Sequence, residues 1–176
     1  IARFSVDIAC PYFYPRRAFR RSLLAAAQRG VRVRLLMQGK VDYRLAALAA
    51  RVQYDELLSQ GVRVFEYTPA FLHAKVAVVD DMWAKVGSSN IDPYPLLMAR
   101  GANIFVRDAN FADQLRVELL LMIDGGSQRV EPGRWAGRSP LAKAASWVAY
   151  GLVRVGMGLL GYGGNEWFVQ RTHRAH

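Results

Sequence analysis

The chain has 176 residues, of which 52% are hydrophobic and 22% charged, so it has enough apolar side chains to bury the core of one globular domain. This composition argues against disorder, and the single cysteine, Cys10, excludes a disulfide framework and a zinc site built from thiolates. Lysine and arginine outnumber aspartate and glutamate by 24 to 14, and the net charge of +10 favours an anionic partner, either phospholipid or a nucleic-acid backbone.

The first half of the chain alternates strand patterns with helix patterns. The expected strands are β-branched and apolar runs at residues 4–10, 31–37 and 62–67. Two helices are expected between them, the first beginning at Pro15 and ending at Gly30, the second capped by Asp42 and ending at Gly61. Because the sequence opens at Ile1 inside a strand pattern, we expect the chain to be part of a longer protein.

The second half continues with strands and then a helix. These elements are expected at residues 71–80, 83–86 and 102–106 for the strands and 110–123 for the helix. The order predicts an α/β fold over residues 1–130, with a mixed β-sheet flanked by helices on both faces. Proline and glycine residues then predict a linker at residues 131–140.

His73 and Lys75 are the residues that point to a chemical activity. Residues two apart on a strand share a face, so the imidazole and the ammonium can meet one phosphate. Neutral imidazole is a competent nucleophile, and the ammonium offsets charge on the phosphate oxygens in the transition state. Asp80 has the opposite parity, and we expect a structural role for it at the end of the strand.

A short glycine and serine segment follows the return strand. Gly87, Ser88 and Asn90 allow backbone N–H groups, a hydroxyl and an amide to approach an anion closely. A lone histidine and lysine pair on a strand is usually a solvated surface, but the five polar and charged residues together favour an active site. The three histidines are too dispersed for a metal cluster, so we expect neither metal nor cofactor.

The spacing of these residues resembles the phospholipase D superfamily, whose motifs H-x-K-x4-D and G-S-x-N match His73, Lys75, Asp80, Ser88 and Asn90. Residues 1 to about 130 are similar to the second catalytic half of bacterial cardiolipin synthases. The resemblance implies His73, Lys75 and Asp80 as catalytic residues and Lys75, Ser88 and Asn90 as phosphate ligands. It also implies metal-independent chemistry through a phosphohistidine, at a site completed by an N-terminal half of the same protein or by a symmetric dimer.

Gly101 is a departure from the family pattern. The family commonly has a glutamate 28 residues after the motif histidine, and a carboxylate there fixes the tautomer and orientation of the imidazole. Its loss predicts a lower catalytic rate. Asn103 shares strand parity with Gly101 and could offer a neutral acceptor instead.

The last segment, residues 141–176, is expected to be a membrane-associated helical tail. Its apolar stretches are interrupted by Lys143 and Arg154 and are too short for a spanning helix, while Trp147 and Tyr150 suit the headgroup region. The alternative is a helix packed on the domain. Together with the family resemblance, the tail predicts peripheral association with the cytoplasmic side of a bacterial inner membrane.

Three functions follow from these observations. The first is a phosphatidyltransferase that forms cardiolipin from phosphatidylglycerol. The second is a phosphodiesterase or nuclease of the same superfamily, with the arginines at positions 16, 17, 20 and 21 following a nucleic-acid backbone. The third is a catalytically degenerate half, in which Gly101 marks lost activity.

Overall fold

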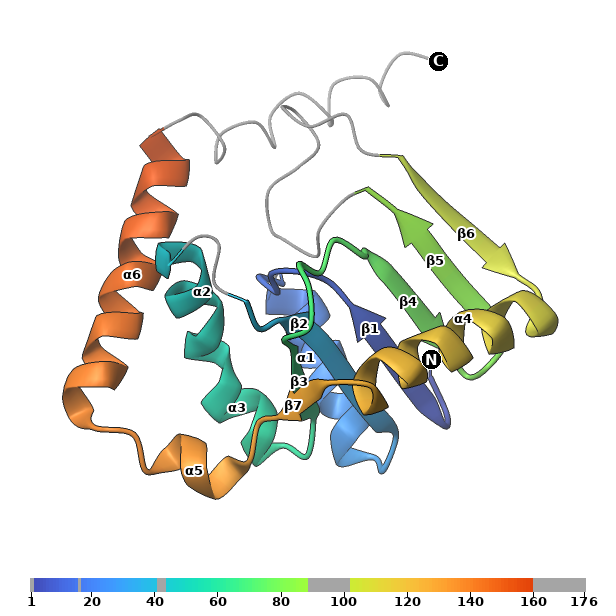
Figure 1. Cartoon of the computed structure of the whole chain (residues 1–176), viewed down its shortest axis with the longest axis horizontal. Helices are drawn as coiled ribbons and strands as arrows, with labels where there is room; N and C mark the ends of the chain where they lie inside the picture. The colour runs from blue at the N-terminus through green and yellow to red at the C-terminus, as the bar shows by residue number, and fades with distance from the viewer. Residues whose placement is uncertain (1, 16, 41–43, 89–101, 160–176) are drawn as a thin grey trace, which may run out of the picture.

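A computed structural model describes residues 2–15, 17–40, 44–88 and 102–159 (Figure 1). The strands of these residues are β1 (Ser5–Ala9), β2 (Arg32–Gln38), β3 (Arg63–Tyr67), β4 (Val76–Val79), β5 (Trp83–Gly87), β6 (Asn103–Arg107) and β7 (Ser127–Arg129). The helices are α1 (Arg17–Gln28), α2 (Arg44–Ala50), the 3-10 helix η1 (Arg51–Gln53), α3 (Tyr54–Ser59), α4 (Ala109–Asp124), α5 (Pro132–Ala136) and α6 (Pro140–Leu159).

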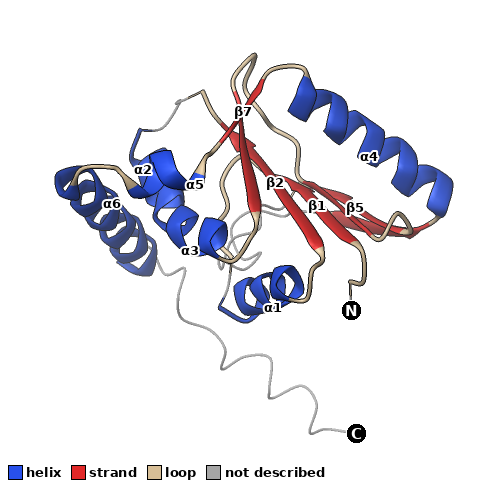
Figure 2. Ribbon diagram, turned by 90° about the horizontal axis from the view of Figure 1, so that it is seen from below, coloured by secondary structure: helices blue, strands red, loops and turns tan. Residues whose placement is uncertain are grey.

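The strands form one mixed sheet in the order β6-β5-β4-β1-β2-β3-β7. β1, β2 and β3 are parallel to one another, and the remaining pairs are antiparallel. Figure 2 shows α4 on one face of the sheet and α1 and α3 on the other. Each face buries its own apolar cluster, one around Leu35 and Val64 and the other around Leu36 and Val78. The predicted mixed sheet with helices on both faces is confirmed.

The glycines expected to end the first two helices do so. Gly30 and Gly61 have φ angles of 88° and 83°, a region that glycine enters without steric cost. At both ends the glycine N–H and the next N–H donate back to carbonyl groups of the last helical turn, which satisfies backbone acceptors that the helix leaves open. The chain then turns directly into β2 or β3.

The prediction of one continuous helix between Asp42 and Gly61 is wrong. It divides into α2, η1 and α3, and Asp42 lies outside the described residues. The side chain of Glu66 on β3 accepts hydrogen bonds from Arg51 at 2.9 and 3.1 Å and from Tyr54 at 3.1 Å. The 3-10 turn brings both donors to this one carboxylate. A tertiary contact therefore overrides the uniform helical pattern.

The segment predicted as a linker, residues 131–140, contains α5 and is attached to the domain. Trp135 packs on Tyr54 with ring centroids 4.8 Å apart, and the guanidinium of Arg138 lies 4.0 Å from the centroid of Trp135. The preceding strand, β7, was not predicted. Its three residues pair with the edge of β3 that does not face β2, so their backbone groups bond the N–H and C=O groups that this edge would otherwise leave unpaired.

The helix α6 packs against α2 at the side of the sheet (Figure 1). Ser146 and Ala149 are buried in this contact, whereas Trp147, Val148 and Leu152 are 62%, 61% and 57% exposed. Among the described residues, none of the helices combines the length and apolar character needed to cross a bilayer. The predicted membrane-associated segment continues beyond Leu159, the last described residue, and its role stays a prediction.

Candidate active site

The structure brings His73 and Lys75 together. Lys75 Nζ lies 3.2 Å from His73 Nε2 and donates to the His73 carbonyl oxygen at 3.1 Å. Both residues precede β4 and are not part of it, so the strand predicted over residues 71–80 is shorter than expected. The extended backbone before β4 nevertheless puts both side chains on one side, as the two-residue spacing predicted.

The two side chains differ in exposure, and this difference suits them to different tasks. His73 is exposed, whereas Lys75 is 8% exposed. Burial lowers the pKa of the Lys75 ammonium, although the neighbouring Cys10 thiol acts to raise it. A charged ammonium can only donate, so in a neutral His73 that keeps this contact Nε2 is the acceptor and Nδ1 is the nitrogen that carries the ring proton. Nε2 therefore carries the lone pair that can attack an electrophile.

A buried glutamine at the end of β2, Gln38, holds the segment that carries the pair. Gln38 Oε1 accepts the backbone N–H of the buried Leu72, and Gln38 Nε2 donates to the carbonyl oxygen of Lys40 at 2.7 Å. Lys40 Nζ in turn donates to the carbonyl oxygen of Pro69 at 3.2 Å. Gln38 was not predicted. The only signal in the sequence was a polar residue at the end of a buried strand.

The glycine of the second motif is required by close packing. A Cβ atom at Gly87 would lie 2.6 Å from the carbonyl oxygen of Ala102 and closer still to the side chain of Asn103. Ser88 N donates to the Ala102 carbonyl oxygen at 3.0 Å, and Ser88 Oγ accepts from Ala102 N at 3.0 Å. These two hydrogen bonds fix Ser88 at the end of β5. The same end of β5 lies next to the segment that carries Lys75, because Gly87 N donates to the Lys75 carbonyl oxygen at 3.2 Å.

Asp80 lies at the opposite end of β4 from Lys75. Its carboxylate accepts the backbone N–H groups of Arg3, Phe4 and Ser5 at 2.8, 2.7 and 3.0 Å. Partial burial acts to raise the pKa of Asp80, but the three donors outweigh it and hold this pKa below its usual value. This motif residue fastens the entry of β1 to the end of β4, in agreement with a structural role.

Three other positions were singled out in the sequence, namely Asn90, Gly101 and Asn103. Asn90 and Gly101 lie outside the described residues. Asn103, the neutral acceptor suggested in place of a glutamate, begins β6 directly opposite Gly87. Its side-chain oxygen lies over Gly87, and its part in orienting His73 stays a prediction.

Comparison with known proteins agrees with this geometry. The family model of the cardiolipin synthase, phospholipase D-like domain matches residues 1–122. The chain belongs to this family. Cardiolipin synthase B of Escherichia coli K12 is 44% identical over 130 residues, which are 74% of this chain and 32% of that protein. Its counterpart in Salmonella typhimurium LT2 is 36% identical over 161 residues, or 92% of this chain and 39% of that protein.

This chain of the cardiolipin synthase family thus spans about a third of the length of the relatives that it matches. Two solved structures share its fold at low sequence identity. Phosphatidylserine synthase from Haemophilus influenzae has a TM-score of 0.62 at 14% identity, covering 92% of this chain and 41% of that one. Nuc, a phospholipase D family member from Salmonella typhimurium, has a TM-score of 0.59 at 18% identity, covering 74% and 84%.

Proposed function

We propose that the chain is one catalytic half of a phosphatidyltransferase that forms cardiolipin from phosphatidylglycerol. The observation that carries this proposal is the 3.2 Å contact between His73 Nε2 and Lys75 Nζ. It places a nucleophilic nitrogen and a buried cation at one point, where a single phosphodiester can meet both. The identity to cardiolipin synthase B over most of this chain supports the choice of substrate.

The proposed chemistry has two steps. In the first, His73 Nε2 attacks phosphorus and the bond from phosphorus to the headgroup oxygen breaks, so glycerol leaves after taking a proton from a general acid. In the second, the hydroxyl of another phosphatidylglycerol attacks phosphorus, the phosphorus–nitrogen bond breaks, and a general base takes the hydroxyl proton. Lys75 neutralises charge on the non-bridging oxygens in both steps, and Ser88 and Asn90 complete the phosphate contacts.

The acid and base of this scheme come from a second half-site. The described residues supply one histidine to the site, and the relatives are about three times as long as the matched region. We therefore propose that an N-terminal half of the same protein, or a second copy of this chain, provides the other histidine. A single copy without that half binds phosphate but does not turn over.

The exposed face of α6 is the surface that we propose meets lipid. Five large apolar residues on α6 are exposed, namely Leu141, Trp147, Val148, Leu152 and Val155. They lie on the side away from α2, whereas the packed side carries the small residues Ser146 and Ala149. An apolar helix face with a tryptophan at its margin suits the headgroup region of an anionic membrane. This arrangement supports peripheral attachment to a membrane, which we propose to be the cytoplasmic side of the bacterial inner membrane.

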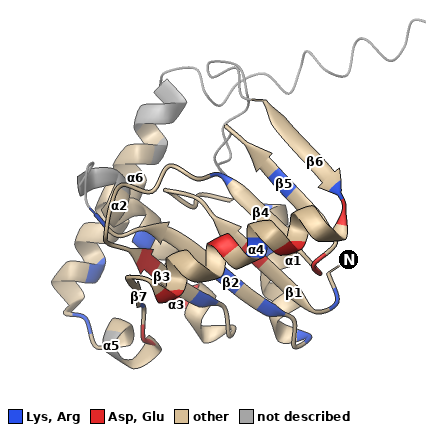
Figure 3. Cartoon of the chain, turned by 45° about the vertical axis from the view of Figure 1, so that its right-hand side comes forward, with Lys and Arg blue, Asp and Glu red and all other residues tan. Residues whose placement is uncertain are grey.

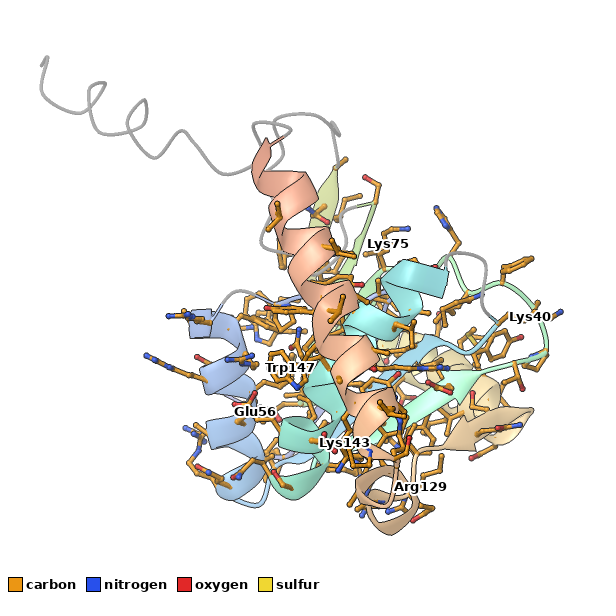
Figure 4. All side chains as sticks on the ribbon, turned by 90° about the vertical axis from the view of Figure 1, so that its left-hand side faces the viewer. Lys40, Glu56, Lys75, Arg129, Lys143 and Trp147 are labelled. Atoms are coloured by element: carbon orange, nitrogen blue, oxygen red, sulfur yellow. The ribbon has the colours of Figure 1, made fainter. Side chains whose placement is uncertain are left out.

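The proposed activity is tested by cardiolipin synthesis in phosphatidylglycerol liposomes, with the full-length parent protein and no added metal. We expect product from the wild type, none from His73→Ala, and a rate at least about 100-fold lower for Lys75→Ala. Lys143→Ala is the matched lysine control, because that ammonium binds the carbonyl oxygen of Ala136 on α5 and lies far from Lys75 (Figure 4). Product from His73→Ala would overturn the assignment of the nucleophile.

A parallel assay separates the alternatives. The same proteins are incubated with single-stranded DNA, and cleavage that depends on His73 without cardiolipin formation would favour the nuclease. No turnover of either substrate would indicate a degenerate half.

Membrane attachment is tested separately by sedimentation with the same liposomes. Val148→Asp should release the protein while its circular dichroism spectrum is unchanged, and continued binding would refute the lipid contact of α6.

A further inference from the structure

We propose that Lys85 on β5 is a second cationic residue of the phosphate site, acting with Lys75 on the same anion. This inference rests on the proposed function, because it concerns the same phosphate. It adds a residue that belongs to neither of the two sequence motifs. Figure 3 shows the basic position in the middle of β5, beside β4.

The sheet register places the two lysines on one face. Ala77 pairs with Lys85 across β4 and β5, and Gly87 N donates to the Lys75 carbonyl oxygen, so Lys75 lies opposite Gly87. Residues two apart share a face, and Lys75 and Lys85 are therefore diagonal neighbours on adjacent antiparallel strands. Long side chains reach each other across such a diagonal. His73, which contacts Lys75, is within the same neighbourhood.

The electrostatics of Lys85 agree with this placement. Burial lowers the pKa of the Lys85 ammonium, the Cys10 thiol acts to raise it, and the Lys75 ammonium lowers it further. Two like charges held close together on a half-buried surface repel each other. A phosphate bound between them removes this repulsion and gains attraction from both. The pair is thus arranged to meet one anion.

The sheet face around Lys85 is accessible to a ligand. Phe105, its cross-strand neighbour on β6, is 72% exposed, and Trp83 is 47% exposed with the guanidinium of Arg107 5.5 Å from its ring centroid. Among the described residues, α1 and α3 cover this face of the sheet over the central strands but not over β5 and β6 (Figure 2). Among the described residues, the charged and titratable groups of this face next to Lys85 include Cys10, Lys75 and Arg107, with His73 at its edge and the arginines of α1 over the central strands.

The test measures binding of inorganic phosphate to the 176-residue chain, by titration calorimetry and by the imidazole NMR signals of His73. Lys85→Met should weaken phosphate binding about five- to twenty-fold, because it removes a positive charge near the anion. Lys85→Arg keeps that charge and should restore most of the affinity. Lys143→Met is the matched control and should bind phosphate as the wild type does. If the methionine variant does not fold by circular dichroism, Lys85→Gln replaces it.

A second readout tests the coupling of the two lysines. In Lys75→Met, the pKa of Lys85 followed by NMR should rise, because a neighbouring positive charge is gone. Unchanged phosphate affinity in Lys85→Met would overturn the proposal, as would weak binding that Lys85→Arg does not restore or the absence of phosphate binding to the wild type. Binding is measured without turnover, so these failures are distinct from a failure to form cardiolipin.

Discussion

Replacing Asp80 with alanine tests whether this motif carboxylate holds the fold. The variant loses three hydrogen bonds from backbone N–H groups, of which the one from Ser5 is partly buried and the two from Arg3 and Phe4 are exposed. A hydrogen bond to a charged group contributes about 1.5–3 kcal/mol, and water replaces most of an exposed one. Asp80 also has a φ angle of 52°, where alanine is strained by roughly 1 kcal/mol. We expect the variant to lose about 3–4 kcal/mol of unfolding free energy.

Urea unfolding of the 176-residue chain measures this loss, with Asp81→Ala as the matched control. Asp81 has the same φ angle of 52° but forms one ion pair, at 2.9 Å, with Arg116. Surface ion pairs contribute about 0–1 kcal/mol, so we expect the control to lose only about 1–2 kcal/mol.

The pH dependence gives an independent check with Asp80→Asn. The pKa of Asp80 in the folded state is below its ordinary value of 3.8. Its charge therefore stabilises the fold above this value, and the stabilisation is lost as the pH falls through the folded pKa. The stability difference between wild type and Asp80→Asn should thus be constant near neutral pH and shrink in acid. A loss in Asp80→Ala no larger than in Asp81→Ala, or a difference that does not change in acid, would refute this reasoning.

Three further predictions concern packing around the site and the core. Gly87→Ala should lower the free energy of unfolding in urea by about 1–3 kcal/mol, because the new Cβ would lie 2.6 Å from the Ala102 carbonyl oxygen. The control is Gly133→Ala, whose Cβ would have no atom within 4 Å and which should be neutral or stabilising. Gln38→Ala leaves a buried N–H of the motif segment without its acceptor, so we expect a loss of about 1–3 kcal/mol by thermal unfolding and weaker phosphate binding. Tyr54→Phe removes one hydrogen bond to the carboxylate on β3 and should cost about 1 kcal/mol, and an unchanged midpoint in urea would contradict that contact.

The sequence by itself predicted the order of the first six strands with helices between them, and the meeting of His73 with Lys75. Strand and helix patterns depend on neighbouring residues, and so do the helix ends at Gly30 and Gly61, which need only a residue that tolerates positive φ. The His73 and Lys75 pair is also local, because two-residue spacing on an extended backbone places both side chains on one side.

Long-range contacts were beyond the sequence. Nothing near Gln38 indicates that its side chain holds the N–H of Leu72, 34 residues away, and nothing near Asp80 indicates that its partners begin the chain. The break between α2 and α3 depends on Glu66, which belongs to another element.

The tertiary structure alone decided which surfaces are covered and which residues join the site. β7 extends the sheet because β3 had an open edge, and α6 buries its small residues on α2 while its large apolar residues stay exposed. Lys85 comes beside Lys75 only through the register of β4 with β5. Local sequence patterns set the conformation of each segment. Which residues of different segments come into contact depends on strand pairing and on packing against the two faces of the sheet, and the sequence of a single segment does not contain that information.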